Sequence, residues 1–95
     1  MTSDAPKEIA RFVYSAKFER FLVRCKKTNR DLFRRVGNQI EKVVREPNIG
    51  KPLRHTLKNR RRLHIGSFVL IYEIYDGELR FIDCEHHDKV YKSYS

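Results

Sequence analysis

Two stretches in the first half of the chain carry apolar residues at helical spacing. The first follows Ser15, a favourable N-cap. Its apolar residues recur at i, i+3, i+4 and i+7: Phe18, Phe21, Leu22 and Cys25. The second stretch ends before Pro47. Its apolar residues are Leu32, Phe33, Val36, Ile40, Val43 and Val44. Between them, Thr28 and Asp31 resemble a capping box. We therefore expect two helices that pack as an antiparallel hairpin.

The other apolar stretches are short and predict β-strands over 11–14, 60–65, 68–75 and 79–84. Residues 68–75 are nearly all apolar or aromatic, which is typical of a central strand covered on both faces. Gly66-Ser67 predicts a tight turn before this strand. Asp76-Gly77 predicts a two-residue hairpin after it, because both positions tolerate positive φ. The last three strands should therefore form an antiparallel meander.

These elements follow the order β-α-α-β-β-β, which predicts an α+β fold in a single domain over residues 1–95, with residues 1–8 disordered. We expect the helical hairpin to pack on one face of a small, mainly antiparallel sheet and to leave the other face partly open. Alternate residues of a strand share a face, which groups Arg60, Arg62 and His64 against Leu63 and Ile65. A slip of one residue would invert which group faces the helices.

The positive charge of the chain is concentrated in one segment. The 21 Lys and Arg residues against 12 acids give a formal net charge of +9. Residues 51–64 hold six of these cations and two histidines but no acid. Such clustering favours an anionic partner such as nucleic acid. The N-terminus lacks the apolar core of a signal peptide, and no apolar run could span a bilayer, so we expect a cytoplasmic protein without a membrane partner.

A row of arginines on a strand suits a phosphate backbone, because the guanidinium is always charged and its planar fork matches phosphate oxygens. Arg60 and Arg62 are the leading candidates, and the alternative is a solvated strand edge that discourages aggregation. His64, His86 and His87 lie near this region, and an imidazole can act as acid or base near neutral pH. Neighbours in an extended segment point in different directions, so we expect at most one of the adjacent pair to face a phosphate.

The cysteines and the C-terminal ligand types do not predict a metal site. Cys25 and Cys84 lie far apart on apolar patterns, which indicates buried thiols rather than a disulfide or a metal pair. Cys84, His86, His87 and Asp88 are crowded, but they lack the paired spacing of a zinc site. We therefore expect neither a metal nor a cofactor.

Four short motifs add to the order of the elements. They are Gly50-Lys-Pro-Leu53, Arg62-Leu-His-Ile-Gly66, the strand over 68–72 and the C-terminal Glu85-His-His-Asp-Lys-Val-Tyr91. Together they resemble the RelE/ParE superfamily of bacterial and archaeal toxins, and archaeal RelE-like members most closely. The similarity covers nearly the whole chain, from about Phe12 to Tyr91. No motif is decisive alone, whereas the combination is fairly specific.

The resemblance implies the toxin of a type II toxin–antitoxin system. Its RelE-type members are endoribonucleases that cleave mRNA in the ribosomal A site through the RNA's own 2′-OH, without a metal. The implied partners are the ribosome, mRNA and an acidic, RelB-like antitoxin that holds the toxin inactive. The expected catalytic residues are Arg60, Arg62, His64, His87 and Tyr91. The expected RNA-binding residues are Lys51, Arg54, Lys58, Arg61 and His86.

Several alternatives stay open at this point. Tyr91 could stack on a base or pack against the sheet, and Glu85 could orient an imidazole or be a surface charge. His64 stands where many superfamily members have Arg, and Phe68-Val69 stands where many have Tyr-Arg. The chain could therefore be a non-catalytic, ParE-like gyrase inhibitor, or an inactive relic that binds only antitoxin or ribosome. We expect no direct DNA binding by this chain alone, because its second helix mixes acids and bases.

Overall fold

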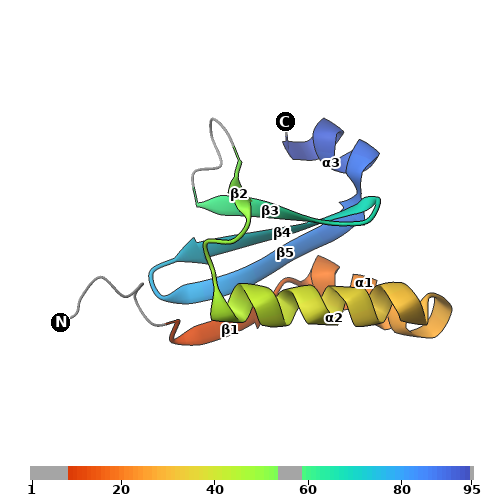
Figure 1. Cartoon of the computed structure of the whole chain (residues 1–95), viewed down its shortest axis with the longest axis horizontal. Helices are drawn as coiled ribbons and strands as arrows, with labels where there is room; N and C mark the ends of the chain where they lie inside the picture. The colour runs from red at the N-terminus through yellow and green to blue at the C-terminus, as the bar shows by residue number, and fades with distance from the viewer. Residues whose placement is uncertain (1–8, 54–58, 95) are drawn as a thin grey trace.

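The computed structural model describes residues 9–53 and 59–94 (Figure 1). Its elements are β1 (Arg11–Tyr14), α1 (Ala16–Thr28), α2 (Arg30–Arg45), β2 (Lys51–Pro52), β3 (Arg60–Ile65), β4 (Phe68–Tyr75), β5 (Glu78–His86) and α3 (His87–Tyr94). The expected α+β fold is confirmed, but the short strand β2 and the C-terminal helix α3 were not expected. The disorder expected for residues 1–8 lies outside the described residues.

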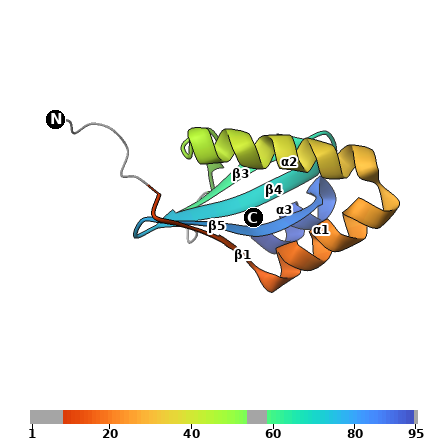
Figure 2. The ribbon, with the colours of Figure 1, turned by 90° about the horizontal axis from the view of Figure 1, so that it is seen from below.

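All five strands form one mixed sheet in the order β1-β5-β4-β3-β2. β1 pairs parallel with β5, and the other neighbours are antiparallel. The hairpin of α1 and α2 packs on one face of the sheet, and α3 lies on the opposite side (Figures 1 and 2). We call the side of the sheet that α3 partly covers the open face. Of the described helices, none is long and apolar enough to cross a membrane.

Side-chain caps define the two long helices. The Ser15 hydroxyl accepts a hydrogen bond from the backbone N–H of Phe18 at 3.0 Å, so this N-cap is confirmed. The capping box expected at Thr28 is wrong. Asn29 caps α2 by accepting from the N–H of Leu32 at 3.2 Å, whereas the Thr28 hydroxyl donates to the carbonyl of Arg24 within α1. Only one residue joins the helices, which places Thr28 inside the first of them.

The sheet divides the core into two clusters. The larger lies under the helical hairpin, and its buried residues are Phe18, Cys25, Leu32, Val36, Val43, Ile65, Leu70, Tyr72, Leu79, Phe81 and Cys84. The smaller lies on the open face, and its buried residues are Val69, Ile71 and Val90. Because β4 contributes to both clusters, its prediction as a central strand covered on both faces is confirmed. Val44, expected on the buried side of α2, is exposed.

A β-bulge in β5 decides which residues of its second half enter the core. Tyr72 pairs with Phe81 but Ile71 pairs with Asp83, so Ile82 is an extra residue in β5. The extra residue reverses the alternation of faces beyond it. Cys84 therefore packs under the hairpin, and Asp83 does not take that position.

The turns follow the sequence signals closely. Asp76 and Gly77 have φ angles of 52° and 76°, which confirms the two-residue hairpin between β4 and β5. Gly66 has a φ of 61° in the turn between β3 and β4. These two turns set the register of the meander, and through it they fix the face on which each side chain of β3 lies.

Candidate functional site

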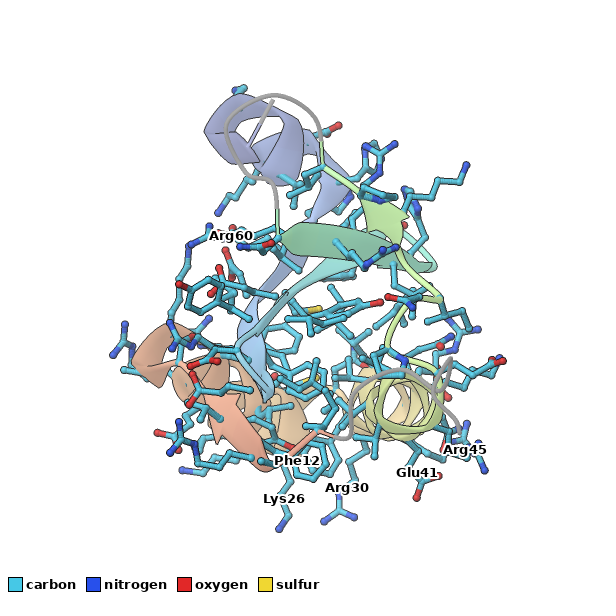
Figure 3. The ribbon with its side chains drawn as sticks, turned by 90° about the vertical axis from the view of Figure 1, so that its left-hand side faces the viewer. Phe12, Lys26, Arg30, Glu41, Arg45 and Arg60 are labelled. Atoms are coloured by element: carbon cyan, nitrogen blue, oxygen red, sulfur yellow. The ribbon has the colours of Figure 1, made fainter. Side chains whose placement is uncertain are left out.

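The basic strand β3 presents alternate cations on the open face. Leu63 and Ile65 pack in the cluster under the helical hairpin. The residues that alternate with them, Arg60, Arg62 and His64, therefore take the opposite face. Figure 3 shows Arg60 at the start of β3, with the sheet between the helical hairpin and α3. The grouping expected from the strand pattern is confirmed, and so is the partly open face that carries the basic row.

Arg60 is already engaged with an acid. Its Nε lies 3.1 Å from a carboxylate oxygen of Glu73, its cross-strand partner on β4. Glu73 also lies 3.7 Å from Arg80, which donates to Glu78, and Glu78 lies 3.4 Å from Arg11. The hydrogen bond from Arg80 holds the pKa of Glu78 below its usual range. We call these five residues the charge ladder. It runs across four strands and offsets most of the charge that Arg60 brings.

Arg62 has a different environment two residues further along the same face. Its cross-strand partner is Ile71, which belongs to the apolar cluster of the open face. Its Nε is buried without a hydrogen-bond partner, and no carboxylate in the described part of the chain pairs with it. A partly buried cation without a counter-charge is costly, and such a group is typical of a site that receives an anion.

His64 completes the row at the β3–β4 turn and is exposed. It lines a polar groove of about 600 Å³ together with Arg35, Lys42 and Arg45 of α2. The imidazole is therefore open to solvent at the edge of the sheet, where β2 no longer pairs with β3. A ligand on the open face could reach His64 from the same side as Arg62.

Arg61, expected to bind RNA, lies on the hairpin side and holds the loop before β2. Its guanidinium donates to the carbonyls of Gly50 at 2.6 Å and Asn48 at 3.2 Å. The buried hydroxyl of Tyr72 donates to the carbonyl of Pro47 at 2.7 Å and accepts from the N–H of Gly50 at 2.8 Å. Burial raises the pKa of Tyr72. Both side chains anchor the backbone that carries β2 to the edge of the sheet.

The loop before β2 packs so closely on Tyr72 that its last residue, Gly50, has no room for a side chain. A Cβ on Gly50 would lie 2.7 Å from the Tyr72 hydroxyl, so the position requires glycine. Lys51 follows it in β2 and is exposed, where its cation is open to a ligand. The other expected RNA-binding residues of this segment, Arg54 and Lys58, lie outside the described residues.

The unexpected helix α3 begins at His87 and packs on the open face. The backbone N–H of His87 donates to the carbonyl of Ser67 in the β3–β4 turn at 2.9 Å. Val90, one turn later, packs on Val69 and Ile71 of β4. These two contacts hold the first turn of α3 over the face that carries the basic row of β3.

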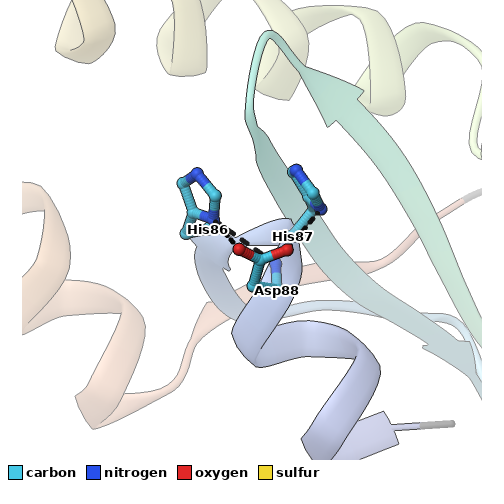
Figure 4. A group of neighbouring side chains, drawn as sticks. All are labelled: His86, His87 and Asp88. Atoms are coloured by element: carbon cyan, nitrogen blue, oxygen red, sulfur yellow. Dashed lines mark hydrogen bonds and ion pairs between the residues drawn. The ribbon is translucent and has the colours of Figure 1, made fainter.

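The expectation that the adjacent histidines point in different directions is wrong, because the chain turns from strand to helix between them. The rings of His86 and His87 stack with centroids 4.7 Å apart and an angle of 27° between their planes. The carboxylate of Asp88 lies beside both rings (Figure 4). His86 also meets the edge of Phe68. Tyr91 follows in α3, and its side chain lies outside the described part of the structure.

Sequence reasoning missed a second ionic cluster, on α1 and β5. The Lys17 ammonium lies 2.7 Å from a carboxylate oxygen of Glu85 and 3.0 Å from one of Asp83, whose side chain is 1% exposed. Hydrogen bonds with these two carboxylates raise the pKa of Lys17, and the bond from Lys17 lowers the pKa of Glu85. Glu85 therefore pairs with Lys17 rather than orienting an imidazole. The signal in the sequence was an aspartate inside an apolar strand.

The two cysteines agree with their prediction as buried thiols. Cys25 and Cys84 are both free and both belong to the cluster under the helical hairpin. Burial raises the pKa of Cys84 to about 12 and also raises that of Cys25. Both thiols line a cavity of about 550 Å³ between α1 and β5, and His86 lines the same cavity.

The fold matches those of small bacterial toxins of known structure. The chain superposes on the YoeB/ParE toxin from Agrobacterium tumefaciens with a TM-score of 0.72 and 17% identity, over 81% of this chain and 98% of that chain. It also matches a chain of the RelBE2 toxin–antitoxin complex from Mycobacterium tuberculosis with a TM-score of 0.65 and 24% identity, over 80% and 95% of the two chains. These matches define the class as the RelE/YoeB-like toxin fold.

Sequence similarity places the chain within this class. Residues 12–91 match the model of the ParE toxin of type II toxin–antitoxin systems, parDE. A Methanocaldococcus jannaschii protein named as toxin RelE4 is 30% identical over 77 residues, which is 78% of this chain and 82% of that protein. The chain therefore belongs to the ParE toxin family of type II toxin–antitoxin systems, within the RelE/ParE superfamily that its motifs resemble.

Proposed function

We propose that this toxin is an endoribonuclease that cleaves mRNA on the ribosome and is held inactive by an antitoxin. The observation that carries the proposal is the position of Arg62 on the open face. It has no carboxylate partner among the described residues, and α3, which begins at His87, packs on the same face. A cation and a proton-transfer group on one surface are what RNA cleavage through an internal 2′-OH requires.

The reaction needs a base for the 2′-OH, an acid for the departing 5′-oxygen and a cation for the charge that develops on phosphorus. We assign the cation to Arg62, whose fork matches phosphate oxygens. We assign one proton transfer to His87, and His64 is the candidate for the other because it lies next on the same face of β3. Tyr91 is proposed to stack on a base.

Arg60 and Arg61 receive smaller roles in this scheme than the sequence suggested. Glu73 already offsets the charge of Arg60, and Arg61 is used to hold the loop before β2. We propose that both arginines position the basic surface. Lys51, Arg54, Lys58 and His86 stay candidates for contacts with the RNA backbone outside the scissile phosphate.

An acidic antitoxin is the proposed inhibitor. One of the matching structures is a toxin–antitoxin complex, and the net charge of +9 on this chain favours a negatively charged partner. Coverage of the open face would block Arg62 and the histidines together, which would explain inhibition without any change in their chemistry.

Primer extension on programmed ribosomes tests the nuclease directly. The wild-type toxin should cut the message, and Arg62→Ala and His87→Ala should each reduce the rate at least about 100-fold. Arg34→Ala is the matched control, because it removes an exposed arginine of α2 that pairs only locally with Asp31. Its rate should stay close to that of the wild type. A folded wild-type protein that binds ribosomes but never cuts would exclude the enzyme.

Inhibition without cleavage is the second candidate, and one observation favours it. Val69, where many superfamily members have Arg, is 2% exposed and packs on Val90. This position supplies no cation to the open face, so the face carries one positive charge fewer than in members that have Arg there. A ParE-like gyrase inhibitor would arrest DNA supercoiling in vitro and leave mRNA intact, and an inactive relic would bind antitoxin or ribosome and do neither.

A further inference from the structure

Three metal-ligand types meet where β5 passes into α3. His86, His87 and Asp88 each offer one ligand atom, and these atoms all lie within 4.8 Å of one another. Figure 4 shows the carboxylate of Asp88 below the two rings, with dashed lines to both. The sequence spacing did not predict this group, because three consecutive residues converge only when the backbone changes from strand to helix between them.

The distances fit a shared metal better than they fit direct hydrogen bonds. The Nδ1 atoms lie 3.2 Å (His87) and 3.7 Å (His86) from oxygens of Asp88. Charged N–H···O bonds are shorter, at about 2.7–2.9 Å. Two ligands that each bind zinc at about 2.0–2.1 Å with tetrahedral angles lie about 3.4 Å apart. These two nitrogen–oxygen separations resemble those between neighbouring ligands of one metal ion, and the three ligand atoms all lie within 4.8 Å of one another.

The backbone fixes where the three ligands start. His87 is tied to the β3–β4 turn through its N–H and the carbonyl of Ser67, and Val90 anchors the next turn of α3 in the apolar cluster. The side chains of His86 and His87 are 44% and 42% exposed, so water can reach the group and fill the remaining coordination positions.

The surroundings decide the kind of metal. Lys17 reaches Glu85 nearby, and the site lies at the positive end of a helix, which opposes weakly bound cations. Two imidazoles and one carboxylate suit borderline transition metals rather than Mg²⁺ or Ca²⁺. The N–H of Asp88 donates a long, 3.4 Å hydrogen bond to Nδ1 of His86, so that nitrogen is an acceptor, and a metal bound there would replace this weak contact.

We propose that His86, His87 and Asp88 form a site for Zn²⁺ or a similar divalent transition metal, with solvent in the open positions. The metal would occupy the imidazole of His87 and would inhibit the toxin. This second statement rests on the proposed nuclease function, whereas the binding site itself does not.

Titration with Co²⁺ and Zn²⁺ tests the site independently of activity. The purified full chain should bind one equivalent, and Co²⁺ should give the visible absorption of a low-coordinate site with nitrogen ligands. His87→Ala and Asp88→Asn should each weaken binding at least about tenfold. His64→Ala is the matched control, since it removes an exposed imidazole outside the cluster and should keep the affinity. Absence of binding, or equal affinity in all four proteins, would overturn the proposal.

A cleavage assay with and without Zn²⁺ then tests the inhibition. Zinc should slow the wild type, and Asp88→Asn should need at least about tenfold more zinc for the same inhibition, each protein being compared with itself. If the chain cuts no RNA, the proposed function fails while the titration still decides the site. If the chain cuts RNA equally with zinc bound, the inhibitory role is wrong.

Discussion

The two ends of the open face carry the same kinds of side chain in opposite electrostatic settings. At the end near the β4–β5 turn, the charge ladder alternates three arginines with two glutamates across the sheet. At the α3 end, Arg62 faces Ile71, which packs with Val69 and with Val90 of α3 in an apolar cluster. One end is therefore close to neutral and internally satisfied, whereas the other offers a cation whose partner must come from outside.

The difference lies in the cross-strand neighbour and not in the arginine. Arg60 and Arg62 share a strand, a face and a residue type, but β4 places Glu73 beside one and Ile71 beside the other. An ion pair with good geometry consumes the hydrogen-bonding fork that a phosphate would need. A basic row on a strand is therefore a candidate surface, and only the neighbouring strand shows which member of the row is available.

The largest effect is expected from the imidazole at the α3 end. His87→Gln keeps the size and polarity of the side chain but removes its proton transfer, and we expect cleavage to fall about 10²–10⁴-fold. The thermal midpoint should change little, because the ring is substantially exposed. Single-turnover kinetics with saturating toxin measures the loss. A fall of less than tenfold would contradict the role of His87 and would assign its proton transfer to His64.

The next largest effect is expected from Tyr72, whose hydroxyl anchors the loop that carries β2. Tyr72→Phe removes a buried hydroxyl and leaves the N–H of Gly50 without its acceptor. The free energy of unfolding should therefore fall by about 1–3 kcal/mol. Urea denaturation measures this free energy. Tyr75→Phe is the matched control: its side chain is 62% exposed, and the change should stay within about 0.5 kcal/mol. Equal changes in the free energy of unfolding for Tyr72→Phe and Tyr75→Phe would show that the buried hydroxyl does not stabilise the fold.

A smaller change is expected when the charge ladder is opened. Glu73→Gln removes the acid that pairs with Arg60 and frees cationic charge at the neutral end. Binding of an uncleavable RNA should tighten, and the dependence of log affinity on log salt concentration should steepen by about 0.7 for each cation released. Asp76→Asn removes an acid from the β4–β5 hairpin turn, outside the ladder, and should change the slope less. An unchanged slope in Glu73→Gln would mean that RNA never reaches this end.

The smallest effect concerns acid stability at the second ionic cluster. Lys17 lowers the pKa of Glu85, so the ionised pair stabilises the fold above the ordinary glutamate pKa, and this stabilisation is lost as the pH falls through the lowered value. Lys17 is 55% exposed, which limits the contribution to about 1 kcal/mol or less. Glu85→Gln should therefore be less stable than the wild type at pH 7 and equally stable near pH 2, as urea denaturation at both values would show. A difference that persists at pH 2 would exclude an ionic origin.

Much of the fold could be predicted because local signals and the final structure agree. The two amphipathic helices, the apolar strand β4 and the Asp76-Gly77 turn were all visible in the sequence. The helix α3 was missed because Val90 is the one strongly apolar residue among those of its side chains that the structure describes, and its anchor is a backbone hydrogen bond to Ser67. The strand β2 was missed because two residues carry no periodicity.

The candidate site was less predictable, since its chemistry depends on contacts between distant segments. The sequence identified the basic row and the C-terminal histidines as residue types, but not the acid beside Arg60 or the carbonyls that hold Arg61. The stacking of His86 on His87 follows from the change of backbone at the β5–α3 junction. The bulge at Ile82, which keeps Asp83 out of the hairpin-side core, has no signal that alternation alone could provide.

The most direct test of this account compares the two arginines of β3 in one experiment. Single-turnover cleavage on programmed ribosomes should be measured for Arg60→Ala and Arg62→Ala at equal folded concentration. We expect Arg62→Ala to lose about 10²–10³ in rate and Arg60→Ala to lose less than about tenfold, because Glu73 has already offset its charge. Equal losses, or a larger loss from Arg60→Ala, would contradict the division of the open face into a neutral end and an anion-receiving end.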